Sequence, residues 1–453
     1  MKDSLLPFVN DLPITGEGLS YVCTYTQYDK RMDPATSLRK PGVRRPALPS
    51  LTGARWYAAL AVFILHCVIF LPVYPFQRTQ AFVNLHKAIP MQLGSLGVTF
   101  FFLLSGFIIY YSSRSDDTPL LFYRRRVLKI FPTHWLSTLM LMALVAVPFS
   151  RLITWLPEVF LIHTWNPQWT YLGALNVPAW SLCAEILFYF SFPLLKPLVE
   201  KLHSNKQIII AFVTLLVALI VMHVCYYCFT DGPKGIANAF SVRILDTTTS
   251  LHYPANSDPA WFQRESVAYY PSYWLSYYFP LSRFGEFWLG VLACKLVISG
   301  WWRNTKIWWP TLLLAISYAL TWWVPINFKM SALFLLPTAM CIATLARRDL
   351  EGKSTFLNSK TNVWLGNVSF AFYMVQYPVM VWVTRTFIGG KSYGWAGWLG
   401  FSVLAFVVSL IVSGLVYTYV DKPIMKNWAR PKKTGGPTQK LSLIHICRCR
   451  RIE

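Results

Sequence analysis

The sequence predicts an all-α protein that crosses a membrane about ten times, with its N- and C-termini in the cytoplasm. Two observations point to this class. The 453 residues are 55% hydrophobic and only 13% charged, and apolar segments long enough to cross a bilayer recur along nearly the whole chain. A third observation gives the orientation, because Lys and Arg gather in alternate loops between these segments.

Ten apolar segments form the predicted helices. A spanning helix needs about 20 mostly apolar residues, and segments of this kind occur at 56–73, 93–111, 130–149, 177–195, 208–229, 280–299, 308–324, 330–346, 363–384 and 394–420. A further apolar piece, residues 152–165, is shorter and contains Pro157 and Glu158. We interpret it as an interfacial or re-entrant segment.

The basic residues orient these helices. If the N-terminus is cytoplasmic, most of the 42 Lys and Arg residues fall on cytoplasmic segments, as the positive-inside rule requires. Ten spans then return the C-terminus to the cytoplasm. The net charge of +23 therefore reflects membrane topology and contact with anionic lipids. We expect a multi-pass protein of the inner or plasma membrane, with the lipid bilayer and not nucleic acid as a partner.

The chain divides into three parts. Residues 1–50 form a polar cytoplasmic arm without the apolar region of a signal peptide, residues 51–430 form the membrane domain, and residues 431–453 form a cytoplasmic tail. Residues 441–451 break the hydropathy pattern and resemble the translation of a sequencing-library adapter, so they are excluded from the fold prediction. The longest external loop, about 230–279, has acidic and aromatic side chains suited to sugar or peptide contact, and equally to interfacial packing.

The cysteines suggest neither a disulfide framework nor a metal site. Once residues 441–451 are set aside, those in or beside the predicted spans are Cys67, Cys183, Cys225, Cys228, Cys294 and Cys341. Their spacing matches no zinc-binding pattern. We expect no metal and no bound cofactor.

Three of the ionisable residues within or at the edge of predicted spans are candidates for function. Glu185 interrupts an otherwise uncharged apolar stretch, where a charge costs roughly 2.5–3.5 kcal/mol on insertion scales, so it indicates either a functional group or a polar contact between helices. Arg55 and His66 are eleven residues apart, close to three helical turns, so both project from one face about 16 Å apart. A buried imidazole suits proton transfer, since its neutral form is tolerated in a membrane. A hydrogen bond made only for packing is the simpler alternative.

A cluster of four cations follows the second predicted span, at a membrane boundary. Such a cluster can simply enforce topology, and it also offers the guanidinium groups that bind phosphates. Its members are Arg124, Arg125, Arg126 and Lys129.

Seven motifs, taken in order, resemble those of the acyltransferase family 3 membrane proteins. The first combines Arg55 and His66 at the family's spacing of eleven. The others are Gly97 to Phe107, Arg124 to Pro132, Asn176 to Tyr189, Arg283 to Gly290, Leu365 to Tyr373 and Tyr419 to Pro423. The resemblance covers residues 51–425, nearly the whole membrane region.

The resemblance implies an integral membrane O-acyltransferase of the type that acylates polysaccharides and other extracytoplasmic acceptors. The donor would be acyl-CoA, with acetyl-CoA preferred, entering from the cytoplasm. The acceptor would be a hydroxyl group of a glycan or of a small molecule outside the cytoplasm. Ten helices would surround a central cavity.

The resemblance also implies roles for individual residues. His66 would act as general base on the acceptor hydroxyl and Glu185 would orient it, the two meeting in the outer half of the membrane; a transient acyl-enzyme is the alternative. Acyl-CoA would bind Arg55, Arg124, Arg125, Arg126 and Lys129. The acceptor side of the cavity would comprise Ser105, Trp180, Ser181, Tyr189, Arg283 and Glu286, although the last two, one helical turn apart, are equally suited to an intrahelical ion pair.

Three positions depart from the family pattern. Thr99 stands where many members have Asp, Gln376 where many have His, and Asp421 where Glu is usual. None of them alters the set of Arg55, His66 and Glu185, and they leave the identity of the acceptor open. The amide of Gln376 does not titrate, so it is not assigned a proton-transfer role.

A proton-coupled transporter is the alternative function. It would use His66 and Glu185 as a relay and the long external loop as a lid. The chain has no obvious two-fold internal repeat, and its clustered cations suit phosphate, two observations that favour the enzyme. A catalytically silent scaffold would make the buried Arg, His and Glu accidental. The acceptor, the acyl group beyond a preference for acetyl, and the oligomeric state are left open.

Overall fold

The computed structural model describes residues 45–69, 84–85, 89, 91–113, 117–144, 152–230, 271–388 and 393–429. These residues form helices and connecting turns, and no β-strand occurs among them. All belong to one of the two units of the chain, residues 34–453. The polar arm before residue 45, the external loop between residues 231 and 270, and the tail with its 441–451 segment lie outside the described residues.

A helix occupies each of the ten predicted segments. These helices are α2 (Pro49–Ile69), α5 (Gln92–Ser112), α6 (Pro119–Leu144), α9 (Trp180–Glu200), α10 (Asn205–Phe229), α12 (Pro280–Ile298), α13 (Trp308–Leu320), α15 (Leu335–Leu350), α16 (Lys360–Val383) and α17 (Trp395–Val416). Short α-helices lie between or after them: α7 (Leu152–Val159), α8 (Trp169–Leu172), α11 (Pro271–Tyr277), α14 (Ile326–Lys329) and, after α17, α18 (Lys422–Asn427). The remaining turns are the 3₁₀ segments η3 (His163–Trp165), η4 (Val177–Ala179), η7 (Ala332–Phe334) and η8 (Phe356–Asn358), and the π-helical segments η9 (Thr384–Ile388) and η10 (Tyr417–Asp421).

Six helical stretches of the described residues are long and apolar enough to cross a membrane, so this is a multi-pass membrane protein. They are Pro49–Val68, Gln92–Ser112, Pro119–Leu144, Val177–Glu200, Asn205–Phe229 and Trp395–Asn427. The others fall short for physical reasons: α13 and α15 are brief, α12 carries three charged residues, and Asn367 and Gln376 lower the mean hydropathy of α16. Ten spans, and the cytoplasmic placement of the termini, stay predictions.

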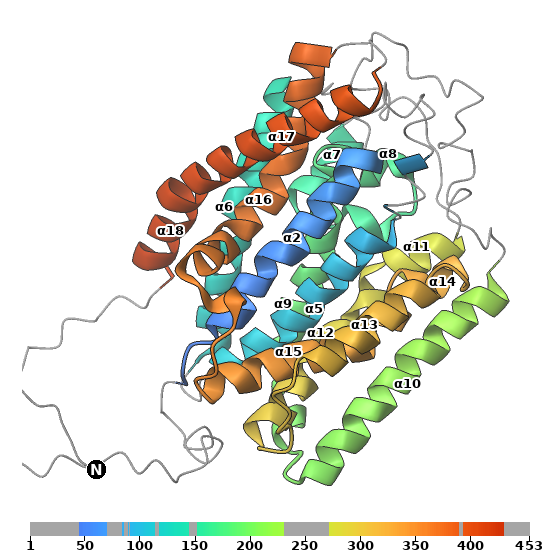
Figure 1. Ribbon diagram of the computed structural model, residues 1–453, viewed down its shortest axis with the longest axis vertical. Coiled ribbons are helices and arrows are strands. Elements are labelled where there is room, and N and C mark those ends of the chain that lie inside the picture. The colour runs from blue at the N-terminus through green and yellow to red at the C-terminus, as the bar shows by residue number, and fades with distance from the viewer. Residues whose placement is uncertain are drawn as a thin grey trace, which may run out of the picture. The chain divides into compact units, whose positions relative to one another are not determined.

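The outermost helices have one packed face and one apolar exposed face. In α17, Phe401, Ala405, Ser409 and Ser413 are buried, whereas an interleaved row of apolar residues is exposed: Leu399, Val403, Val407, Ile411 and Leu415. Both rows repeat every four residues, as expected for a helix at the boundary between protein and lipid. Figure 1 shows α17 and α10 along opposite edges, with α2, α5 and α16 between them.

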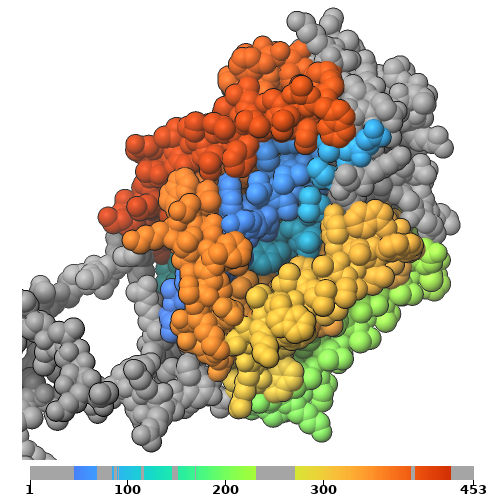
Figure 2. Space-filling view, in the orientation of Figure 1, coloured from blue at the N-terminus to red at the C-terminus, as the bar shows by residue number. Residues whose placement is uncertain are grey.

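Glycines bring the central helices into backbone contact. A Cβ atom on Gly106 of α5 would lie 1.8 Å from the carbonyl oxygen of Phe287 in α12, and one on Gly290 would lie 1.9 Å from that of Leu103. The pair α2 and α16 meets in the same way at Gly366. Small residues permit such close approach in membrane proteins. In the space-filling view the blue surface of α2 lies in a hollow between the red α17 and the yellow and orange helices of residues 308–350 (Figure 2).

The segment predicted to be interfacial or re-entrant, residues 152–165, forms α7 and η3, with Glu158 buried and Ile153 and Phe160 exposed. The chain that leads from it into α9 is packed inside the protein. Residues 172–184 are buried without interruption. Glu158 of α7, fully buried, accepts hydrogen bonds from the backbone N–H groups of Leu175 at 2.8 Å and Asn176 at 2.5 Å. Burial raises the pKa of this carboxyl to about 8, and the two hydrogen bonds oppose that rise. Helix α9 therefore begins inside the protein.

Candidate active site

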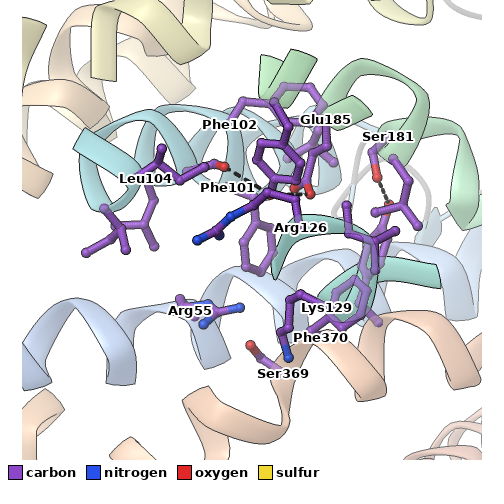
Figure 3. Close-up of a pocket in the computed structure, with 18 residues that line it drawn as sticks. Arg55, Phe101, Phe102, Leu104, Arg126, Lys129, Ser181, Glu185, Ser369 and Phe370 are labelled. Carbon is purple, nitrogen blue, oxygen red and sulfur yellow. Dashed lines mark hydrogen bonds between the residues drawn. The ribbon is translucent and has the colours of Figure 1, made fainter. Parts of the chain in front are cut away.

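A cavity of about 180 Å³ lies between α2, α5, α6, α9 and α16. Its charged lining consists of Arg55 from α2, Arg126 and Lys129 from α6, and Glu185 from α9. Figure 3 shows these side chains approaching one space from different helices. The apolar part of the lining is Val98, Phe101, Phe102, Leu104, Ile108, Ile109, Ile130, Leu182 and Phe370.

The predicted cation cluster divides between two faces of α6. Arg126 and Lys129 are three residues apart, so they lie on one face of the helix, and both line the cavity. Arg124 is exposed. The Nη2 atom of Arg125 lies 2.6 Å from the Oδ2 atom of Asp117. Arg124 and Arg125 therefore do not join the cavity, because the helical rotation that turns their neighbour inward turns them away.

Glu185 is the acidic residue among the described residues that line the cavity. The hydroxyl of Tyr189, one turn further along α9, donates a hydrogen bond to its Oε2 atom at 2.8 Å. The hydroxyl of Ser105 on α5 lies 3.3 Å from that of Tyr189. This chain of three polar groups places two hydroxyls and one carboxylate beside the three cations of the cavity.

Lys129 has an acidic partner outside the cavity lining. Its Nζ atom lies 3.1 Å from the Oδ2 atom of Asp421 in η10, and the hydroxyl of Thr133 donates a hydrogen bond to the other carboxylate oxygen. The Nζ atom also lies 5.1 Å from the centre of the Phe370 ring. Sequence reasoning treated Asp421 only as a departure from the family pattern. Its place in the last motif was the signal that could have identified it.

His66 is not among the described residues that line the cavity. Its side chain is hydrogen-bonded to that of Gln376, whose amide nitrogen donates to the backbone carbonyl of Tyr373 at 3.0 Å. One departure from the family pattern therefore lies beside the predicted base, because α16 packs directly against α2 and brings Gln376 to His66.

Among the described residues, the cavity that Glu185 lines does not include His66. Glu185 shares the lining with Arg55, and His66 lies eleven residues further along α2, about 16 Å away along the helix axis. The cavity joins the first turns of α2 and α9, where Arg55 and Glu185 lie. Their catalytic pairing stays a prediction.

The other predicted cavity residues divide into two groups. Ser105, Ser181 and Tyr189 line the cavity. The hydroxyl of Ser181 lies 3.0 Å from that of Tyr373, a further lining residue that sequence reasoning had not assigned to the site. Trp180 is buried away from the cavity, with its ring centre 4.6 Å from that of Tyr277.

Arg283 and Glu286 form the intrahelical ion pair that was one of two alternatives. Their Nη1 and Oε1 atoms are 3.0 Å apart, with 0% and 1% of the side chains exposed. The hydroxyl of Thr99 accepts a hydrogen bond from Arg283 at 3.1 Å, and that of Ser331 donates one to Glu286 at 2.6 Å. Neither charged residue belongs to the cavity lining.

The chemistry that this arrangement can perform is anion binding beside a proton-transfer group. Guanidinium and ammonium groups bind phosphate and carboxylate, and a carboxylate with a bonded tyrosine hydroxyl can hold or accept a proton. Within the described part of the chain, no group of three or more His, Cys, Asp or Glu could hold a metal ion.

Comparison with known proteins gives a consistent result. Residues 48–418 match the family model described as an acyltransferase domain. Acyltransferase MdmB of Streptomyces mycarofaciens is 32% identical over 396 residues, which cover 84% of this chain and 92% of that protein. O-acetyltransferase OatA of Staphylococcus aureus is 21% identical over 424 residues, 86% of this chain and 60% of that protein. Exopolysaccharide production protein ExoZ of Rhizobium meliloti is 34% identical over 106 residues, 22% of this chain and 33% of that protein. No solved structure matches the chain.

Proposed function

Because the chain belongs to acyltransferase family 3, we propose that it transfers an acyl group, preferentially acetyl, from cytoplasmic acyl-CoA to a hydroxyl of an extracytoplasmic carbohydrate or related acceptor. The observation that carries the proposal is the cavity itself, in which three cations surround one carboxylate. Two relatives, an O-acetyltransferase and an exopolysaccharide production protein, support the acetyl group and the carbohydrate acceptor.

The cations of the cavity would bind the donor. Arg126 and Lys129 offer adjacent positive charges on one face of α6, and Arg55 faces them from α2. Such groups recognise the phosphates of CoA. A volume of about 180 Å³ is smaller than acyl-CoA, so the phosphates would lie at these cations and the pantetheine arm, with the acyl group at its end, would extend past Arg55.

The reaction is nucleophilic substitution at a thioester. A base removes the proton of the acceptor hydroxyl, the oxygen attacks the thioester carbonyl carbon, the new C–O bond forms, and the C–S bond breaks. CoA leaves as the thiolate and takes up a proton to become the thiol. We assign the base to His66 and a supporting electrostatic role to Glu185.

The lining of the cavity favours a second assignment of the base. Glu185 is directly exposed to the cavity and is bonded to Tyr189, whereas His66 is bonded to Gln376. In this version Glu185 accepts the proton of the acceptor hydroxyl, and the Tyr189 hydroxyl stabilises the oxyanion. A transient acyl-enzyme on His66 is a third route, in which the acyl group moves along α2 before it reaches the acceptor.

Turnover of radiolabelled acetyl-CoA tests the proposal. Purified protein in vesicles is given an extract of envelope glycans, and wild type is compared with His66→Ala and Glu185→Gln. Label in a base-labile glycan ester with wild type alone establishes O-acetyl transfer and a need for both residues. If His66→Ala retains turnover and Glu185→Gln loses it, the base is Glu185. Acetyl-CoA that neither binds nor reacts would favour a transporter.

A further inference from the structure

We propose that Asp421 is a positioning residue of the donor site, which fixes the ammonium group of Lys129 at the cavity wall. The π-helical turn η10 would serve to deliver its carboxylate there. The proposal rests on the proposed function in one respect, namely that the cavity takes an acyl-CoA donor. The contacts of Asp421 themselves are independent of that assignment.

The register of the last long helix changes just before Asp421. Along α17 the buried residues Ser409, Ser413 and Val416 follow one another at intervals of four and three, as in any amphipathic helix. The next buried residue is Asp421, five positions after Val416. An uninterrupted α-helix would continue the buried face at position 419 or 420, and Tyr419 is 73% exposed.

The backbone explains this change of register. The N–H group of Lys422 bonds to the carbonyl oxygen of Tyr417, five residues earlier, which is the π-helical pattern. Pro423 has no N–H group, so it cannot donate a helical hydrogen bond, and its ring crowds the carbonyl group four residues before it. The inserted residue rotates the chain that follows by about 100°, and the side chain of Asp421 then faces α6.

Both oxygens of the Asp421 carboxylate are engaged by α6. Oδ2 lies 3.1 Å from the Nζ atom of Lys129, and Oδ1 accepts a hydrogen bond from Thr133, one turn further along the same helix. Asp421 is 4% exposed and the Lys129 side chain 29% exposed. The carboxylate is therefore held from two sides in the protein, while the ammonium group keeps access to the cavity.

Lys129 needs such an anchor because of its neighbours. Its ammonium group lies within electrostatic range of two like charges, Arg55 and Arg126, and the lysine stem is flexible. Glu185 in the same cavity attracts the ammonium group, so its position depends on competing charges. Contact with Asp421 fixes it on the α6 side, and the Phe370 ring, with its centre 5.1 Å from Nζ, supports the same position.

This arrangement acts on donor binding and not on the chemical step. A phosphate entering the cavity meets an ammonium group that is already in place, so less side-chain ordering is required when the donor binds. Asp421 itself does not line the cavity and touches neither the donor nor the acceptor. Its removal should therefore change the KM for acyl-CoA, with kcat largely preserved.

The test measures KM for acetyl-CoA and kcat for wild type, Asp421→Asn, Asp421→Glu and Thr133→Val. The matched control is Glu351→Gln, which removes a carboxylate from an ion pair with Arg347 at 2.7 Å, outside the cavity. We expect Asp421→Asn to raise KM about tenfold, as for the loss of one charge-assisted hydrogen bond. The KM of Asp421→Glu should stay within about twofold of wild type. The KM of Thr133→Val should rise less than that of Asp421→Asn, and Glu351→Gln should have the KM of wild type.

Two kinetic results would overturn the proposal. One is an Asp421→Asn protein whose folded fraction has the KM of wild type, and the other is an Asp421→Glu protein as impaired as Asp421→Asn. Labelling of lysines with acetic anhydride, read by mass spectrometry, tests the positioning without any turnover: Asp421→Asn should raise the rate at Lys129 and leave it unchanged at Lys353. Unchanged labelling at Lys129 refutes the positioning, whereas a wild-type protein that neither binds nor consumes acetyl-CoA refutes the donor assignment alone.

Discussion

Two buried groups of charged side chains lie on either side of Phe102, and they differ in how their charges are balanced. On one side Phe102 lines the cavity with three cations and Glu185. On the other, its ring centre lies 5.2 Å from the guanidinium carbon of Arg283, which is paired with Glu286. The first group has an excess of positive charge beside open space. The second is neutral and closely packed.

The difference shows that burial of a charge does not by itself mark an active site. A buried ion pair such as this one, with hydrogen bonds to Thr99 and Ser331, balances its own charges. A cavity lined by more cations than carboxylates can accept an anionic ligand, because an incoming anion completes the balance. The two regions should therefore respond to mutation in opposite ways, one in activity and the other in stability.

The largest expected effect is on turnover at Glu185. Glu185→Gln keeps the size of the side chain and removes the charge, so it should lower kcat by about 10²- to 10⁴-fold, the range for loss of a proton-transfer group. Its midpoint of thermal unfolding should stay near that of wild type. The rate of glycan ester formation from acetyl-CoA measures the first quantity. A kcat within threefold of wild type would remove Glu185 from the mechanism.

The next effect concerns the stability of the packed pair. Arg283→Met leaves the carboxylate of Glu286 buried without its cation, so it should reduce the free energy of unfolding by about 3–5 kcal/mol. Denaturant unfolding in detergent measures the loss. The double variant Arg283→Met/Glu286→Leu should recover most of it, since no isolated charge remains. A single variant as stable as wild type, with impaired donor binding, would place Arg283 in the active site.

A smaller effect is expected at Arg126, one of the two cations that α6 contributes to the cavity. Arg126→Gln removes one positive charge from the lining and should raise the KM for acetyl-CoA about tenfold, or about 1.4 kcal/mol. Its kcat should change little. Donor affinity measured by equilibrium dialysis should fall by the same factor, and an unchanged affinity would contradict the assignment of the cavity to the donor.

The smallest effect is expected at Arg125, the residue before Arg126. Arg125 pairs with Asp117, and 25% of its side chain is exposed. Arg125→Gln should change stability by about 0–1 kcal/mol, as for a surface ion pair, and should leave the KM for acetyl-CoA unchanged. This variant is the matched control for its neighbour. An equal rise of KM in both would mean that the cluster acts by overall charge and not through the cavity.

The positions of the helices could be predicted well from sequence, but their depth could not. Every predicted apolar segment contains a helix, because hydropathy reports directly on burial in lipid or protein. The start of α9 depends on the packing of residues 152–179 inside the protein, for which a hydropathy pattern has no signal. Which residues of neighbouring helices meet, such as Glu185 with Arg55 at the cavity and His66 with Gln376, likewise depends on packing that hydropathy does not report.

Within the site, residue types were easier to predict than faces. Four cations were identified on α6, yet only the packing of the helix decides that Arg126 and Lys129 face inward. Asp421 shows the same limit more sharply. A period of 3.6 residues does not place it on the buried face of α17, because the π-helical turn before it alters the count.

The glycine contacts have a mechanical consequence. Where α5 meets α12 at Gly106, and α2 meets α16 at Gly366, backbone lies against backbone with no side chain to rearrange, so these four helices should move as one block. The opposite walls, α6 and α9, contain prolines at positions 132, 193 and 197, each of which removes a backbone hydrogen bond and eases bending. Helix α16 contains Pro378 as well, but its glycine contact with α2 ties it to the block. We therefore expect the cavity to widen by the swing of α6 and α9 against a fixed block. The helix that carries Arg126 and Lys129 would then also be the gate through which the donor enters.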